Sequence, residues 1–130
     1  MTKQELLRYR ALAVELEQMR ETIERLDQSI SGVRASVLTG MPKGGRRSGT
    51  AERVAKLVDL REMYAKKWEA LLDEMRRIEA AVEMLSDPVE RALVRYKYID
   101  GKTWDEVCEA IHYELRQTHR IHTRALKNLA

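Results

Sequence analysis

The chain has 130 residues with a net charge of +3, and charged side chains make up 35% of it, whereas it has only five tyrosines, two tryptophans and no phenylalanine. The single cysteine excludes an internal disulfide. Charged residues interrupt every apolar run, which excludes a signal peptide and a membrane-spanning segment and predicts a soluble, cytoplasmic protein. Because Ala, Leu, Glu, Arg and Lys predominate, the composition favours an all-α fold over a sheet.

A long first helix is predicted over residues 2–37. Thr2 and Glu5 have the spacing of a capping box, in which each side chain bonds the backbone N–H of the other residue. The apolar residues that follow are spaced alternately three and four apart, which is a heptad seam. The positions of this seam are Tyr9, Leu12, Leu16, Met19, Ile23, Leu26, Ile30, Val33 and Val37.

A second helix of similar length is predicted over residues 51–85, with Thr50 as its N-cap. Its seam has one polar interruption, Arg61, and consists of Val54, Leu57, Arg61, Tyr64, Trp68, Leu71, Met75, Ile78, Val82 and Leu85. Two matched helices joined by one loop predict an antiparallel coiled-coil hairpin over residues 1–86.

Further apolar residues beside the second seam widen the apolar stripe: Val58, Leu60, Ala65, Leu72 and Ala81. A second chain could cover them, which predicts a homodimer or a higher homo-oligomer formed through the coiled coil. Alternatively, the C-terminal helices of the same chain cover this surface.

The loop over residues 38–50, "LTGMPKGGRRSGT", is rich in glycine and has three basic and no acidic side chains: Lys43, Arg46 and Arg47. It lacks the "GK[ST]" ending of a nucleotide-binding loop, and no strand precedes it. We interpret it as a flexible hairpin tip, with a secondary contact to DNA or to polymerase as the alternative.

Residues 87–130 are predicted to form a separate module of three short helices. Asp87 as N-cap and Pro88 at the first helical position start a helix over residues 88–99. After the turn 100–102, the capping box of Thr103 and Glu106 starts a helix over residues 103–111. The last helix is predicted to run from Tyr113 or Glu114 to residue 129.

The last two helices fit a helix-turn-helix, which requires apolar or small residues at its inward positions. Val107, Cys108, Ile111, Thr118, Ile121, Ala125, Leu126 and Leu129 are expected to face inward, with Tyr113 plugging the turn. The residues left to face the bases of double-stranded DNA are Leu115, Arg116, Gln117, His119, Arg120 and Thr123. The residues expected near phosphates are Arg124, Lys127 and Lys102. Residues 114–130 hold four basic side chains and one acidic side chain, which agrees with an anionic partner.

The stretch "DPVERALVRYKYIDGKTWDEVCEAIHYELRQTHRIHTRALKNL" resembles region 4 of bacterial sigma factors. The pattern "TWDEVCEAI…R…I…RALKNL" matches without gaps over some 27 residues. Together with the loop "LTGMPKGGRRSGTAERVAKLVDL" and the coiled coil, nearly the whole chain is similar to small phage-encoded late-transcription regulators of the RinA/ArpU type.

The resemblance implies a DNA-binding regulator of phage or prophage transcription that acts with RNA polymerase in the bacterial host cell. By position, it places Leu115, Arg116, His119 and Arg120 against promoter DNA. Three residues depart from the family pattern, among them Leu115, which is apolar where polar readers are common and is either a contact to a thymine methyl group or a core residue. His112 stands where the turn usually has a residue tolerant of a left-handed backbone, and Glu114 replaces the usual Ser or Thr cap.

Two other functions share this layout. One is a phage small terminase subunit that binds DNA as a ring, and the other is a protein-docking module that does not read bases. No metal site is expected from Cys108, His112, His119 and His122, since the chain has no Cys-x-x-Cys pair. No cofactor is expected, and without a catalytic set at credible spacing an enzyme is not expected either.

Overall fold

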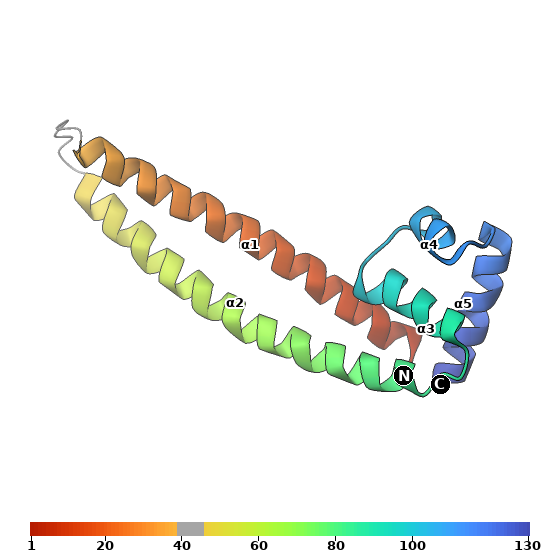
Figure 1. Cartoon of the computed structure of the whole chain (residues 1–130). Helices are drawn as coiled ribbons and strands as arrows, with labels where there is room; N and C mark the ends of the chain where they lie inside the picture. Colours follow the sequence, from red (N-terminus) through yellow and green to blue (C-terminus); the bar gives the residue numbers. More distant parts are fainter. Residues whose placement is uncertain (39–45) are drawn as a thin grey trace. The chain divides into compact units, whose positions relative to one another are not determined.

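The computed structural model describes the backbone of residues 1–38 and 46–130 and the side chains of residues 1–32 and 49–130. Over these residues the chain is helical and has no strand, which confirms the all-α prediction (Figure 1). Its elements are α1 (Lys3–Leu38), α2 (Arg46–Glu83), α3 (Pro88–Val94), the π-helical turn η1 (Arg95–Ile99), α4 (Trp104–Ile111) and α5 (Leu115–Leu129). In the described ranges, none of these helices combines the length and the apolar character needed to cross a membrane.

The predicted start of the first long helix is confirmed, but that of the second is wrong. The Thr2 hydroxyl accepts a hydrogen bond from the Glu5 N–H at 3.3 Å, and the Glu5 carboxylate accepts one from the Thr2 N–H at 2.7 Å. In contrast, α2 begins at Arg46, so Thr50 is an interior helical residue rather than an N-cap. Glycine and threonine inside a helix cost about 1 kcal/mol or less each, and no proline follows Arg46 to stop the helix there.

The basic loop is therefore shorter than expected. Lys43 lies outside the described residues. Arg46 and Arg47 lie in the first turn of α2, and the description of that turn is limited to its backbone.

The chain divides into two compact units, one formed by residues 1–13 with 70–130 and the other by residues 14–69. This division differs from the expected boundary after residue 86. The ends of the long helices near the N-terminus of α1 and the C-terminus of α2 belong with the short helices.

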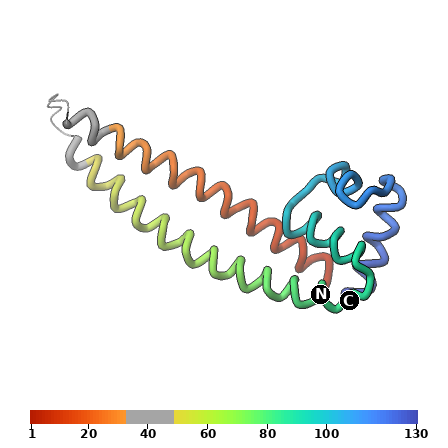
Figure 2. Tube along the Cα trace, in the orientation of Figure 1, coloured from red at the N-terminus to blue at the C-terminus, as the bar shows by residue number. Residues whose placement is uncertain are grey.

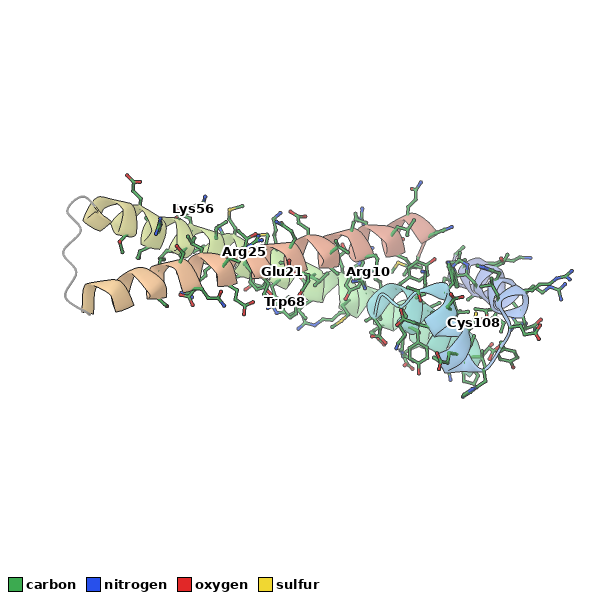
Figure 3. The ribbon with its side chains drawn as sticks, turned by 90° about the horizontal axis from the view of Figure 1, so that it is seen from above. Arg10, Glu21, Arg25, Lys56, Trp68 and Cys108 are labelled. Carbon is green, nitrogen blue, oxygen red and sulfur yellow. The ribbon has the colours of Figure 1, made fainter. Side chains whose placement is uncertain are left out.

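In the unit of residues 14–69, segments of α1 and α2 lie side by side and run in opposite directions (Figures 1 and 3). Glu15 pairs with Lys67, and Asp27 pairs with Arg61 at 3.6 Å, so positions later in α1 meet positions earlier in α2. The buried seam residues of this unit are Leu16, Ile30 and Leu57. Arg61, the polar interruption of the seam, is exposed and forms an ion pair.

In the other unit, the short helices share a core with the ends of α1 and α2. Its buried apolar side chains come from all of these elements: Leu6, Tyr9, Leu71, Ile78, Val82, Leu85, Leu93, Val94, Tyr98, Val107, Ile121, Ala125 and Leu129. The two termini meet, because the ammonium of Met1 donates to the carbonyl of Leu129 at 3.1 Å (Figure 2).

Polar contacts also join α1 and α2 to η1 within this unit. The Arg10 guanidinium, labelled in Figure 3, donates to the carbonyls of Tyr98 and Ile99 at 3.3 and 2.9 Å. Arg95 donates to the carboxylates of Glu79 and Glu83. These bonds fix the start of the α4–α5 segment on the ends of the long helices.

Candidate nucleic-acid interface

Helices α3, α4 and α5 pack around a small apolar cluster. Leu93 of α3, Val107 of α4 and Ile121 of α5 are its buried centre. Val89, Tyr96, Trp104 and Ile111 pack around that centre and are themselves partly buried. One residue from each helix therefore fixes the angle at which α5 crosses the other two.

The starts of α3 and α4 match the sequence prediction. The Asp87 carboxylate accepts from the Val89 N–H at 2.9 Å, with Pro88 at the first helical position. At α4, the Thr103 hydroxyl accepts from the Glu106 N–H, and the Glu106 carboxylate accepts from the Thr103 N–H, both at 3.3 Å. Hydrogen bonds from the Thr103 hydroxyl and backbone lower the pKa of Glu106, so this cap keeps its charged form.

A tight turn joins α4 to α5. His112 ends α4 in the left-handed region, with φ of 60°, which confirms that this position requires a residue tolerant of that backbone. Glu114 is the N-cap of α5 and makes no side-chain capping hydrogen bond. This agrees with the absence of Ser or Thr at the position.

The expectation that Tyr113 plugs this turn is wrong, since 42% of its surface is exposed. Its carbonyl, rather than its ring, faces α5 and accepts from the Thr118 hydroxyl at 3.5 Å. Thr118 itself is fully buried, as expected of an inward position.

The other inward positions of α5 are confirmed. Ile121, Ala125 and Leu129 are buried, and Leu126 is partly buried. In α4, Val107 is buried, whereas Cys108 and Ile111 are only partly buried.

A cluster of aromatic and histidine rings holds one edge of α5. The Tyr98 hydroxyl and His122 Nε2 are 2.6 Å apart, and both residues are buried. The Trp104 ring lies 4.7 Å from the His122 ring and 4.6 Å from the His119 ring, measured between centroids. Burial, reinforced by the positive charges of nearby residues, lowers the pKa of His122 to about 4, so its ring is neutral near pH 7.

His122 lies buried at the helix interface, and sequence reasoning missed Tyr98 as its partner. The π-helical turn η1 brings Tyr98 there. The Asp100 N–H donates to the Arg95 carbonyl at 2.9 Å, a step of five residues that a single α-helix over residues 88–99 would not make. An α-helical period would have given Tyr98 a different direction, and no local sequence signal marks the change.

The face of α5 turned away from the buried Thr118, Ile121 and Ala125 carries a cationic strip. Its members follow one another at steps of three and four residues, so they lie on the same helical face, and all are exposed: Arg116, Arg120, Thr123 and Lys127. Helix α5 contains no acidic residue. In the described part of the chain, none of the charged groups of the strip has an ion-pair or hydrogen-bond partner, and the Thr123 hydroxyl donates to the His119 carbonyl at 3.0 Å.

The unpaired state of Arg116 and Arg120 is unusual in this chain. Most arginines with a described side chain have an acceptor, as Arg20 has in Glu17 and Arg77 in Glu5. Leu115 and Gln117 are also exposed at the start of the helix, and His119 is exposed beside Trp104. The predicted base-facing residues are therefore all accessible.

Arg124 has a different environment from the one that sequence reasoning gave it. Its Nε donates to the Glu90 carboxylate at 2.5 Å, and its Nη2 donates to Asp87 at 2.9 Å. Glu90 is only 2% exposed and also accepts from the Asn128 amide. The guanidinium of Arg124 thus neutralises a buried carboxylate of α3. Because it is engaged by this carboxylate, it is not free to bind a phosphate as predicted. The acidic partners lie more than thirty positions earlier, beyond the reach of helical spacing rules.

The remaining predicted phosphate ligand, Lys102, lies in the turn before α4. Its ammonium is 5.5 Å from the centroid of the Tyr96 ring, and its carbonyl accepts from the Lys97 ammonium at 3.3 Å. Lys97 in turn lies over the Trp104 ring at 4.7 Å.

Among the residues with described side chains, no group of three or more His, Cys, Asp and Glu could hold a metal ion. Comparison of the chain with known protein families, curated proteins and solved structures found no match.

Proposed function

We propose that the chain is a sequence-specific DNA-binding regulator of phage or prophage transcription that acts with RNA polymerase. In this proposal, α3, α4 and α5 form a helix-turn-helix module like sigma region 4, and α5 enters the major groove. The short turn, the left-handed His112 and the buried contacts of Val107 and Ile121 support this arrangement.

The observation that carries the proposal is the unpaired cationic strip of α5. Several solvent-facing arginines of this chain form acid–base pairs, such as Arg20 with Glu17 and Glu24. A face with two exposed, unpaired arginines and no carboxylate instead suits an anionic partner. Arg116 and Arg120 can each donate two hydrogen bonds to guanine O6 and N7, and Lys127 suits a backbone phosphate.

We further propose that α1 and α2 form an antiparallel coiled-coil hairpin through which two copies associate. Two exposed side chains support this, Val58 beside the seam and Trp68, which was predicted to lie in the seam, because burying them stabilises a dimer. The mass in solution, measured by light scattering over a range of concentrations, tests it: a dimer supports the proposal, a monomer contradicts it, and a large ring favours a packaging protein.

The DNA proposal is tested by selecting bound sequences from a random duplex pool at near-physiological salt. The test variant is the double substitution Arg116→Ala, Arg120→Ala. A matched control is Arg53→Ala, Lys56→Ala, which also removes two exposed positive charges but from α2. Circular dichroism of all three proteins verifies that each is folded.

We expect an enriched motif with the wild-type chain and with the α2 control, and its loss with the α5 variant. Each single arginine variant should cost about 1–3 kcal/mol of binding free energy and relax one position of the motif. Equal weakening on all sequences would mean that the arginines contact phosphates only. Absence of any enriched motif would refute sequence-specific binding and favour a packaging or protein-docking role.

A further inference from the structure

Leu115, in the first turn of α5, is exposed over 47% of its surface. It does not belong to the apolar cluster of Leu93, Val107 and Ile121 or to the side chains packed against that cluster. Exposed leucines occur singly on many surfaces. The position of this one, rather than its exposure, is what requires an explanation.

Leu115 lies at the N-terminal end of the helix that carries the cationic strip. It shares a face with His119, one helical turn later, whose ring contacts Trp104, whereas Arg116, the next residue, points about 100° away around the helix axis. The start of α5 therefore presents an apolar edge, formed by Leu115 and the His119–Trp104 contact, beside the unpaired guanidinium groups of Arg116 and Arg120. The surface combines apolar area with positive charge; helix α5 itself contains no acidic residue, and the exposed Glu114, directly before Leu115, is the carboxylate nearest in sequence.

An edge of this composition is complementary to the major groove of DNA at a thymine. The groove offers acceptors on guanine and phosphates for the arginines, and the C5-methyl group of thymine is the main apolar group it presents. A protein partner would also bury Leu115. However, the absence of acidic residues on α5 and the unpaired arginines favour a polyanion.

We infer that Leu115 is a specificity-determining residue that contacts the C5-methyl group of a thymine next to the bases read by Arg116 and Arg120. This inference rests on the proposed DNA-binding function. It adds to that function the chemical identity of one base position and the residue that selects it.

The test replaces each thymine of the selected site, one at a time, by deoxyuridine, which removes only the C5-methyl group. Binding of the wild-type chain and of Leu115→Ala is measured to each duplex. Because burying one methyl group strengthens binding about fourfold, one deoxyuridine should weaken wild-type binding by about that factor. Leu115→Ala should bind the thymine and deoxyuridine forms of that position equally.

Tyr113→Ala is the matched control, because Tyr113 is the other large exposed apolar residue at this turn. It should leave the thymine-to-deoxyuridine ratio as in the wild type. Leu115→Gln is a second variant that keeps side-chain length but removes the apolar contact, and it should behave as Leu115→Ala does. Circular dichroism verifies that the variants are folded.

The outcomes separate this inference from the proposal beneath it. If the wild type selects a motif but no deoxyuridine position depends on Leu115, or if the motif has no thymine, the inference is overturned and the DNA-binding proposal stands. If the wild type selects no motif, both are overturned.

Discussion

Acidification should destabilise this protein through His122. The ring is 8% exposed, its Nε2 is 2.6 Å from the Tyr98 hydroxyl, and burial lowers its pKa from 6.5 to about 4. The unfolded chain binds this proton more readily than the folded protein. The contribution of neutral His122 to the free energy of unfolding is therefore complete above the unfolded pKa of 6.5 and is lost as the pH falls from 6.5 toward 4.

The size of this loss follows from the two pKa values. Each unit of pKa difference corresponds to about 1.4 kcal/mol. Between about pH 7 and pH 5, the unfolded histidine becomes almost fully protonated while the folded one stays mostly neutral. The free energy of unfolding should therefore fall by about 2 kcal/mol over this range because of His122 alone.

Urea denaturation followed by circular dichroism at both pH values measures the effect. In His122→Gln the side chain does not titrate but can still hydrogen-bond Tyr98, so the variant should lose most of the pH dependence. His119→Gln is the control, because His119 is exposed on the same helix. It should keep most of the pH dependence, although its charge contributes to the low pKa of His122. If wild type and His122→Gln lose stability equally on acidification, the argument from burial is refuted.

Three further substitutions test local features, each by the free energy of unfolding in urea. Gly101→Ala should cost about 1–2 kcal/mol because the glycine has φ of 72° and the added Cβ would lie 2.7 Å from the Arg10 guanidinium; in an Arg10→Ala background only the backbone part should remain. Arg124→Ala should lower the free energy of unfolding because it removes the charged donor of the buried Glu90, and an unchanged free energy of unfolding would show that this pair does not stabilise the fold. Thr103→Ala should cost about 1 kcal/mol through loss of the α4 cap, whereas Thr103→Ser should cost much less.

Local patterns were enough to predict most of the secondary structure. The capping boxes at Thr2 and Thr103, the Asp87 cap and the left-handed His112 are all as expected from the sequence. Each depends on residues at most three or four positions apart, which local sequence rules cover. The predicted start of α2 was wrong because Thr50, although a residue type that often caps helices, lies inside α2.

The inward face of α5 was also predictable, since it follows a helical period. Thr118, Ile121, Ala125 and Leu129 are buried as that period requires. The same period identified the outward residues Arg116 and Arg120. Their proposed contacts with DNA remain predictions.

The sequence by itself determined which segments are helical, where most of them begin and which faces of α5 are apolar or cationic, because these properties arise from neighbours within one or two turns. Only the tertiary structure decided which outward charges stay free. Arg124 follows the same helical period as its neighbours, yet Glu90 and Asp87 of α3 occupy its guanidinium. Tyr98 reaches His122 only because η1 adds a residue to one turn. Such pairings depend on how separate helices cross, and the free energy of burying a charge or a ring at a crossing is not encoded in any short stretch of sequence.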